Sequence, residues 1–274
     1  MAHIVIRYCC CFLIIFFCNC IMSAVYAKCT RKINVTFSPT GLTAIASESG
    51  LSGVYPTLLS SVPAKDGCVF DFSMVPRTRQ ELMFQHGQTD LLLPAIKTSR
   101  RDAFGIFIPL LYTRATLVSM RTDLPLVANI QELIDRKTSK VVVVRGYDYG
   151  EIYMNLMQEL TKQDRLIYEA DPGSVARMLK AGAADYTIIA PYILIGEVQM
   201  DARIRDIEDK LHYEVLPELP WLDSGVYLSQ TTLNEQDQQS LKTLFTAFTK
   251  SGAVWKLFKN YYQSDAFNLG SRPR

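Results

Sequence analysis

The sequence predicts an α/β fold of two lobes that face each other across a ligand cleft. Short apolar runs typical of strands alternate with amphipathic segments typical of helices, which is the pattern of βαβ units around a parallel sheet. Two passages, RQELMFQHGQTDLLLPA (79–95) and VARMLKAGAADYTIIAP (175–191), share one order of helix, Gly, Asp and buried strand. That likeness favours two similar lobes over one continuous sheet.

The composition fits a folded protein of this size. The chain has 274 residues, of which 49% are apolar and 20% charged, so it can bury a core as one large or two small domains. The formal net charge is +2, and the basic residues are spread along the chain. This distribution gives no indication of a nucleic-acid partner, and none is expected.

The first half of the mature chain predicts one βαβ lobe. Strands are expected at 33–37, 68–75 and 90–96, with a helix at 54–62 that has a proline in its first turn and a helix at 76–87 that ends in glycine. The pattern then restarts. In the second half, helices are expected at 130–136, 149–162, 174–184 and 191–199, and strands at 140–146, 165–170 and 185–190.

The chain returns to lobe 1 at its end, where 241–262 is helical sequence broken near Ser251-Gly252. We therefore expect lobe 1 to comprise residues 28–115 and 220–274, and lobe 2 to comprise residues 116–219. The crossings between the lobes are expected near 113–117 and 217–224. Open α/β sheets bind ligands beyond the carboxyl ends of their strands, so two facing lobes would enclose a cleft.

Residues 1–27 differ from the rest and predict a signal peptide. Arg7 is their only formal charge apart from the amino terminus, and residues 9–25 are mostly apolar. The segment ends in Val-Tyr-Ala at 25–27, which suits cleavage by a signal peptidase. The run is short for a membrane span and is interrupted by Asn19. We expect cleavage and export from the cytoplasm. A retained anchor or a lipoprotein signal at Cys20 is a less favoured alternative.

Cleavage would remove five of the seven cysteines and leave Cys29 and Cys68. Two thiols exported to an oxidising compartment most simply form one disulfide, which here would tie the starts of two strands. The exported part has no CxxC motif and only His86 and His212. We therefore expect no metal and no cofactor.

The order of these motifs resembles the family 3 periplasmic solute-binding proteins, the amino-acid-type receptors of ABC transporters. The stretch GQTDLLLPAIKTSRRDAFGIFIPLLY (87–112) is similar to the family's Gly-x-x-Asp strand, Ser/Thr-rich turn, arginine and aromatic segment. VVVVRGYDYGEIY (141–153) is similar to the strand, turn and helix of its second lobe. The resemblance covers essentially all of the mature chain and implies the type II periplasmic-binding fold.

The resemblance assigns the ligand's carboxylate to an arginine. Spacing to Phe107 places Arg101 at the family's carboxylate-binding position, with Arg100 as the close alternative. A guanidinium is a planar fork of donors that matches a carboxylate and keeps its charge. Thr98 and Ser99 would add hydroxyl or backbone donors beside it.

In lobe 2, the family's Gly-Ser-Thr turn corresponds to Gly146, Tyr147 and Asp148. A helix start offers free N–H groups to an anion. Asp148 is expected either to cap the helix that begins at Tyr149 or to bind a cationic group of the ligand. Tyr147 would supply a ring face or a hydroxyl.

One departure from the family concerns the ligand's ammonium. Receptors of this family usually place an Asp after the last strand of lobe 2, and here that position is Ala190. Either Asp148 or Asp223 replaces it, or the ligand lacks an α-amino group. An amino acid and a related organic acid both stay open as the ligand.

The remaining candidates are aromatic residues and one pair of arginines. Phe37 lies where the family builds an aromatic wall. Trp221 is expected as a cleft wall or as a buried anchor. In VPRTR (75–79), Arg79 matches a family arginine and Arg77 replaces an aromatic residue. This element is expected either to line the cleft or to form a local salt bridge, of which the salt bridge is favoured.

The sequence therefore predicts a periplasmic solute-binding protein and not an enzyme. It would close around a small carboxylate-bearing solute and present it to a membrane ABC permease or to a sensor protein, acting as a monomer. The alternative is a cyclohexadienyl-type dehydratase on the same fold. That chemistry needs a positioned acid, for which Asp148 and Asp223 are the candidates.

Overall fold

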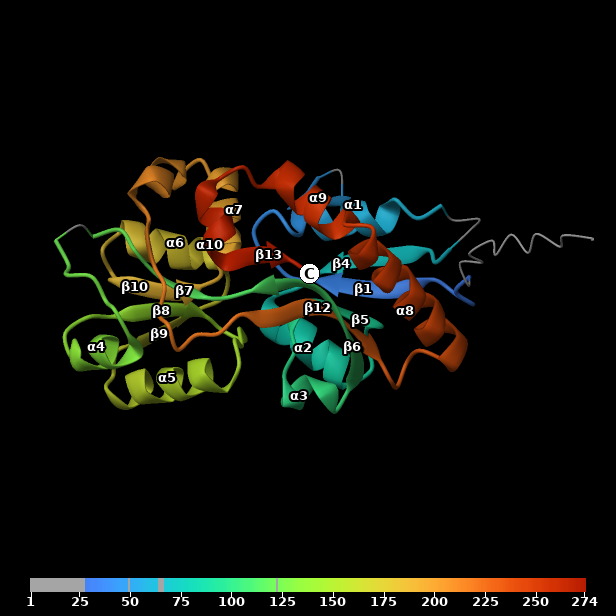
Figure 1. Ribbon diagram of the computed structural model, residues 1–274, viewed down its shortest axis with the longest axis horizontal. Helices are drawn as coiled ribbons and strands as arrows, with labels where there is room; N and C mark the ends of the chain where they lie inside the picture. The colour runs from blue at the N-terminus through green and yellow to red at the C-terminus, as the bar shows by residue number, and fades with distance from the viewer. Residues whose placement is uncertain (1–27, 49, 64–66, 122) are drawn as a thin grey trace, which may run out of the picture.

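Two β-sheets organise the chain into two lobes that lie side by side along the long axis (Figure 1). The computed structural model describes residues 28–48, 50–63, 67–121 and 123–274. Lobe 1 is built on a six-stranded sheet and lobe 2 on a five-stranded sheet. The signal peptide predicted over 1–27 lies outside the described residues.

The sheet of lobe 1 is parallel on one side and antiparallel on the other. β1 pairs in parallel with β4 and β5, as the βαβ pattern predicts, whereas β12 runs antiparallel between β5 and β6. β13 closes the edge against β6. In order across the sheet, the strands are β13 (Ser271–Pro273), β6 (Gly105–Thr113), β12 (Leu222–Ser229), β5 (Leu91–Ile96), β1 (Ile33–Phe37) and β4 (Phe70–Met74).

The sheet of lobe 2 has the same mixed character. β8 pairs in parallel with β9 and β10, and β7 runs antiparallel between β10 and β11. In order, the strands are β11 (His212–Glu214), β7 (Thr116–Ser119), β10 (Tyr186–Ile189), β8 (Val141–Val144) and β9 (Leu166–Glu169). A separate two-stranded ribbon precedes the first helix and consists of β2 (Ile45–Ser47) and β3 (Gly50–Ser52).

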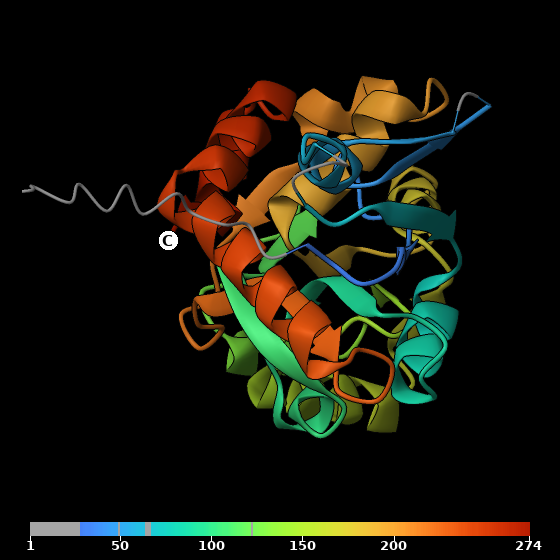
Figure 2. The same ribbon diagram turned by 90° about the vertical axis from the view of Figure 1, so that its right-hand side faces the viewer.

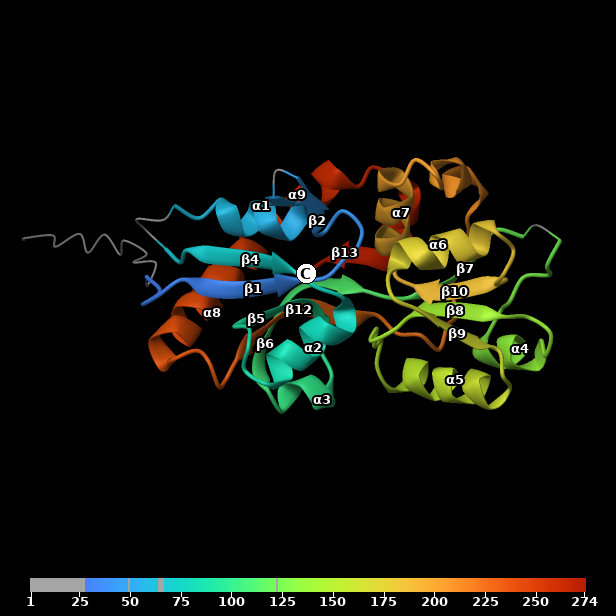
Figure 3. The ribbon, with the colours of Figure 1, turned by 180° about the vertical axis from the view of Figure 1, so that it is seen from behind.

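Helices cover both faces of each sheet, which explains why β5 and β8 are apolar and buried at every position. In lobe 1, α1, α8 and α9 lie on one face, and α2 and α3 lie on the other (Figures 2 and 3). The helices of lobe 1 are α1 (Val54–Ser60), α2 (Arg77–Gln85), α3 (Ser99–Asp102), α8 (Glu235–Lys250) and α9 (Ala253–Tyr261). α10 (Asp265–Gly270), which precedes β13, packs against α7 of lobe 2 (Figure 1).

In lobe 2, α6 and α7 lie on one face of the sheet, and α4 and α5 lie on the other (Figure 3). The helices are α4 (Ile130–Asp135), α5 (Glu151–Lys162), α6 (Pro172–Lys180) and α7 (Pro191–Met200), followed by the 3-10 helix η1 (Arg205–Lys210). Among all described residues, no helix is both long and apolar enough to cross a membrane.

The chain passes between the two sheets twice. The first connection joins β6 to β7 at Thr113–Thr116, and the second joins β11 to β12 at Glu214–Leu222. β13 lies beside the first connection, because Ser271 pairs with Thr113. The lobe limits expected from the sequence fall within these connections, and their exact positions stay a prediction.

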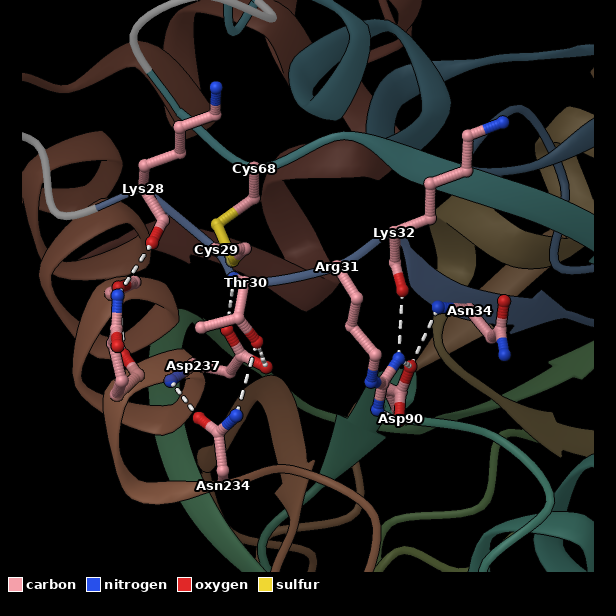
Figure 4. The surroundings of a disulfide bond; sticks show 12 residues. Lys28, Cys29, Thr30, Arg31, Lys32, Asn34, Cys68, Asp90, Asn234 and Asp237 are labelled. Atoms are coloured by element: carbon pink, nitrogen blue, oxygen red, sulfur yellow. Dashed lines mark hydrogen bonds and ion pairs between the residues drawn. A yellow bond between two sulfur atoms is a disulfide. The ribbon is translucent and has the colours of Figure 1, made fainter.

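A disulfide joins the segments that lead into β1 and β4, as predicted. Cys29 is bonded to Cys68, with their Cα atoms 4.8 Å apart (Figure 4). The neighbouring Thr30 donates from N and Oγ1 to the carboxylate of Asp237 in α8, at 2.6 and 2.9 Å. Arg31 donates to both oxygens of Asp90 at 2.7 Å. The beginning of the described chain is therefore fixed to the segment before β4, to α8 and to the residue that precedes β5.

Removal of this disulfide should destabilise the protein. The bond closes a loop with a sequence separation of 39, for which the lost chain entropy corresponds to about 4 kcal/mol. The double variant Cys29→Ser/Cys68→Ser should lower the free energy of unfolding by about 2–4 kcal/mol in urea titrations, and the reduced wild type should behave alike. Equal unfolding midpoints for oxidised and reduced protein would contradict this role.

Candidate ligand-binding site between the lobes

A pocket lies between the two lobes at the carboxyl ends of their parallel strands. Lobe 1 lines it with residues that follow β1 and β4, with the end of β5 and the turn after it, and with Ser224 of β12; lobe 2 lines it with residues that follow β8 and β10. This is the edge at which α/β sheets bind ligands. The lining residues are Thr40, Arg77, Pro94, Ala95, Ile96, Arg101, Tyr147, Asp148, Tyr149, Tyr192, Ile193 and Ser224.

Two arginines of lobe 1 reach the pocket from short turns after strands. Arg77 is the first residue of α2, directly after β4. Arg101 belongs to α3, whose start is capped by Thr98: the Thr98 hydroxyl accepts a hydrogen bond from the Arg101 N–H at 3.3 Å. The Tyr227 hydroxyl accepts from Thr98 N at 3.0 Å and donates to Asp102 at 2.8 Å. The Tyr227 side chain from β12 thus holds the turn that orients Arg101.

One carboxylate, that of Glu81 in α2, binds both arginines. Glu81 accepts from Arg77 Nη2 at 2.6 Å, and from Arg101 Nη2 and Nε at 2.7 and 3.2 Å. The side chains of all three are at most 7% exposed. Backbone carbonyls satisfy further donors, since Arg77 donates to Pro94 at 2.9 Å and Arg101 to Ile96 at 2.8 Å. The three charges form a rigid, largely desolvated floor.

The charges around the pocket leave an excess of one positive charge. Arg100 extends the network at the surface, with contacts of 3.5 Å to Glu81 and 3.3 Å to Asp148. Three arginines therefore face two carboxylates. In addition, the buried Nε of Arg77 has no hydrogen-bond partner among the described residues. A buried unpaired donor is costly unless an acceptor reaches it.

Burial raises the pKa of Glu81, and the charges of Arg77 and Arg101 more than offset that effect, so its pKa is lowered to about 2. Glu81 is therefore ionised at any physiological pH. The excess positive charge of the cluster is permanent, because guanidinium groups also keep their protons.

Tyrosines of lobe 2 form the opposite wall. The Tyr149 hydroxyl accepts from Ala190 N at 3.0 Å, which ties the turn after β8 to the start of α7. The Tyr147 hydroxyl donates to the carbonyl of Pro39 in lobe 1 at 3.3 Å. Burial raises the pKa of Tyr149 and of Tyr192, so both rings stay neutral. The wall therefore adds apolar surface and hydroxyl groups but no charge.

The lobes touch closely at one side of the pocket. Gly41 and Gly196 meet backbone to backbone: a Cβ on Gly196 would lie 2.5 Å from Leu42 N and 2.7 Å from Gly41 Cα. Glu197 of α7 accepts from Gly41 N at 3.0 Å. Tyr192 packs edge-on against Phe258 of α9, with ring centroids 5.8 Å apart. The structure therefore shows the two lobes in a closed arrangement.

The structure brings together only some of the residues that the sequence suggested. Arg101, Tyr147 and Asp148 line the pocket. Thr98 and Ser99 lie in the turn that carries Arg101 but do not line the pocket. The ligand contacts assigned to all of them stay a prediction.

The two aromatic candidates lie elsewhere. Phe37 is fully buried in the core of lobe 1, edge-on to Phe72 at 5.6 Å. Trp221 lies in the second connection, where Arg114 and Arg272 stack on its ring at 4.6 and 4.4 Å. Neither residue lines the pocket.

Two expectations about carboxylates need correction. Asp148 does not cap α5: the helix begins at Glu151 after Gly150, whose φ of 88° turns the chain, and Asp148 Oδ1 accepts from Gly150 N at 2.9 Å. Asp223 is ion-paired with Arg274 and is not part of the pocket lining. Of the two candidates for an ammonium partner, only Asp148 lies at the pocket, and Arg100 already pairs with it.

Sequence reasoning found one of the residues that organise the site and missed two. The local salt bridge expected for VPRTR is present, since Arg77 pairs with Glu81, and Arg77 also lines the pocket, whereas Arg79, which matches the family's arginine, is exposed. Glu81 carried no signal beyond its spacing of four residues from Arg77, which places both on one face of a helix. Tyr192, two residues after Ala190, was missed as a wall of the pocket.

Comparisons with known proteins identify the fold but no relative by sequence. No protein-family model and no curated protein matches the chain. Among solved structures, an ancestral arginine-binding protein bound to arginine has a TM-score of 0.68 at 14% identity, covering 84% of this chain and 98% of that one. An amino acid ABC transporter substrate-binding protein from Streptococcus pneumoniae, bound to L-arginine, has a TM-score of 0.67 at 18% identity, with coverages of 85% and 94%.

A sensory protein shows the same likeness. A histidine kinase sensor domain with similarity to periplasmic binding proteins has a TM-score of 0.66 at 17% identity and covers 84% of this chain and 96% of that one. At these identities the likeness establishes the fold alone. The two-lobe α/β fold predicted from the sequence is confirmed.

The account of Glu81 can be tested by removing its charge. Glu81→Gln leaves Arg77 and Arg101 buried without a carboxylate, so the free energy of unfolding should fall by about 3–5 kcal/mol in urea titrations. The exposed Glu159, which pairs with Lys162, offers a matched control, and Glu159→Gln should change the value by less than about 0.5 kcal/mol. A loss below about 1 kcal/mol for Glu81→Gln would show that the arginines do not depend on it.

The stability of the protein should depend on pH through Glu197, whose carboxylate accepts a hydrogen bond from Gly41 of the other lobe. Burial raises its pKa from 4.5 to about 6, against the opposing hydrogen bond from Gly41 N. A carboxyl with a raised pKa stabilises the fold below its unfolded pKa, and this contribution of about 2 kcal/mol is lost as the pH rises from 4.5 through 6. In Glu197→Gln this part of the pH dependence should vanish. Parallel stability curves for the two proteins between pH 4 and 7 would refute the role of Glu197.

Proposed function

We propose that this chain, which has the two-lobe fold of the type II periplasmic binding proteins, is a solute-binding protein for a small molecule that carries a carboxylate. The observation that carries the proposal is the pair of buried arginines, Arg77 and Arg101, at a pocket lined by both lobes. An amino acid or a related organic acid fits this chemistry.

The carboxylate is recognised through the excess positive charge of the pocket. Glu81 neutralises one of the two buried guanidinium groups, and the unpartnered Nε of Arg77 offers a donor. In a site from which water is excluded, such a charge-assisted hydrogen bond is strong and directional. Tyr147 and Tyr192 would cover the rest of the solute from lobe 2.

Capture requires the lobes to separate and close again. In the closed arrangement the pocket has a volume of about 40 Å³, which is enough for only a few water molecules. A solute of amino-acid size enters once the contacts of lobe 2 with Pro39, Gly41 and Arg100 are broken. The two connections at Thr113–Thr116 and Glu214–Leu222 would act as the hinge. Ligand contacts made by both lobes would favour the closed form.

The partners and the location of the protein follow from this role. We propose that it works in the periplasm after cleavage of its signal peptide, as a monomer that a membrane ABC permease or a sensor protein recognises in the closed form. The likeness to transporter substrate-binding proteins and to a histidine kinase sensor domain supports both readouts equally. The dehydratase alternative gains no support, because Asp148 and Asp223, its candidate acids, are both ion-paired with arginines.

A screen by thermal shift tests the proposal. Carboxylate-bearing solutes, with and without an α-amino group, should raise the melting temperature, since a ligand at 100 times its Kd adds about 2.7 kcal/mol to the stability of the native state. Arg77→Met and Arg101→Met should each lower the affinity for the hit by roughly 100-fold, measured by calorimetry on protein shown to be folded.

The exposed Arg79 in the same helix as Arg77 provides the control, and Arg79→Met should bind as the wild type does. If both pocket variants keep wild-type affinity, the solute binds elsewhere. If no solute of any class shifts the melting temperature, the proposed function is wrong.

A further inference from the structure

A second hollow adjoins the pocket and opens between the two lobes. This groove of about 380 Å³ lies between α2 of lobe 1 and α5 of lobe 2, and we refer to it as the outer groove. It shares Tyr147 and Asp148 with the pocket. Glu81 and Arg100 also line it, and the rest of its lining is mainly apolar and consists of Leu82, Gln85, Tyr153, Met154, Met157 and Tyr168, beside Thr78 and Gly146.

The charges of the outer groove are gathered at its inner end. Its three charged residues are Glu81, Arg100 and Asp148. Glu81 holds both arginines of the pocket, and Arg100 bridges Glu81 and Asp148. The groove therefore changes from charged at the pocket to apolar at the outside. A molecule that lies along it has its apolar part at the outside and its other end at the charged residues that border the pocket, where Arg77 and Arg101 lie.

The apolar part of the groove is exposed to solvent. Leu82 is 48% exposed, Met154 is 40% exposed and Tyr168 is 44% exposed, although they lie near one another around a single hollow. Water against such surface is unfavourable, by about 25 cal/mol per Å² of apolar area. Methionine side chains adapt to ligands of varied shape, which suits a groove lined by Met154 and Met157.

The net charge of the residues around the pocket limits the charge of the ligand group that binds there. Arg77, Arg100 and Arg101 exceed Glu81 and Asp148 by one positive charge. A monoanion brings the site to neutrality. A zwitterion brings an ammonium as well, and Asp148, the carboxylate in the described lining of the pocket, already pairs with Arg100 at 3.3 Å.

We propose that the ligand is an amphipathic monocarboxylate without an α-amino group. Its carboxylate binds at Arg77 and Arg101, and its apolar body lies in the outer groove between α2 and α5. This inference rests on the proposed function and names the ligand class for the same site.

A series of unbranched carboxylates tests the apolar part. Butanoate, hexanoate and octanoate should bind with affinities that rise about fourfold per methylene, since one buried methylene contributes about 0.8 kcal/mol. The pair 3-phenylpropionate and L-phenylalanine has the same apolar body and differs by the ammonium. Calorimetry should find 3-phenylpropionate the tighter ligand by at least tenfold.

Two variants on one helix locate the apolar body. Met154 lines the outer groove, whereas Ile152, 43% exposed on the same helix, does not line it. Met154→Asp should weaken octanoate binding by at least tenfold, and Ile152→Asp should leave it unchanged. Both side chains are exposed enough for either variant to fold, and circular dichroism confirms this before titration.

Each result decides between the two proposals. Rising affinity along the series, together with loss in Met154→Asp alone, supports the outer groove as the apolar subsite. Tighter binding of L-phenylalanine than of 3-phenylpropionate, or equal binding of butanoate and octanoate, overturns this inference and leaves the proposed function standing. Absence of binding by every carboxylate, amino acids included, overturns both.

Discussion

The carboxylate of Glu81 is the interaction on which the candidate site depends. It lies between two guanidinium groups that the chain buries almost completely, and it connects α2, which follows β4, to the turn after β5. Burial of a guanidinium without a partner would cost several kcal/mol, so this one side chain permits both arginines to remain inside the molecule. The geometry of the pocket follows from it, because neither arginine can move without breaking a hydrogen bond of 2.7 Å or less.

The same cluster gives the space between the lobes its chemical character. Two arginines and one carboxylate in low-dielectric surroundings keep a net positive charge that solvent screens poorly. In the described pocket lining, lobe 2 brings neutral tyrosines, Ile193 and the ion-paired Asp148 against it. The lobes close on a cation rather than on a neutral surface. Selection by this protein would therefore act on the charge of the solute first and on its shape second.

Alternation of strands and helices, the two-lobe architecture and the position of Arg101 were all predictable from the sequence, because each depends on local pattern and chain order. β6 was harder to recognise, since Pro109 interrupts its apolar run and lies at the register shift opposite Gly225. The approach of Gly41 to Gly196 and the pairing of Glu81 with Arg101 join residues far apart in the sequence. Such contacts depend on how helices and lobes pack against each other, and this packing cannot be predicted from the local pattern of a single sequence.

The most direct test of this account is a crystal structure of the protein with a carboxylate found by the ligand screen. The account predicts that a carboxylate oxygen lies within hydrogen-bonding distance, about 2.7–3.2 Å, of a guanidinium nitrogen of Arg77 or Arg101, with Glu81 still bound to the pair and the solute enclosed by both lobes. A carboxylate bound away from both arginines, or a solute held by one lobe alone, would contradict it.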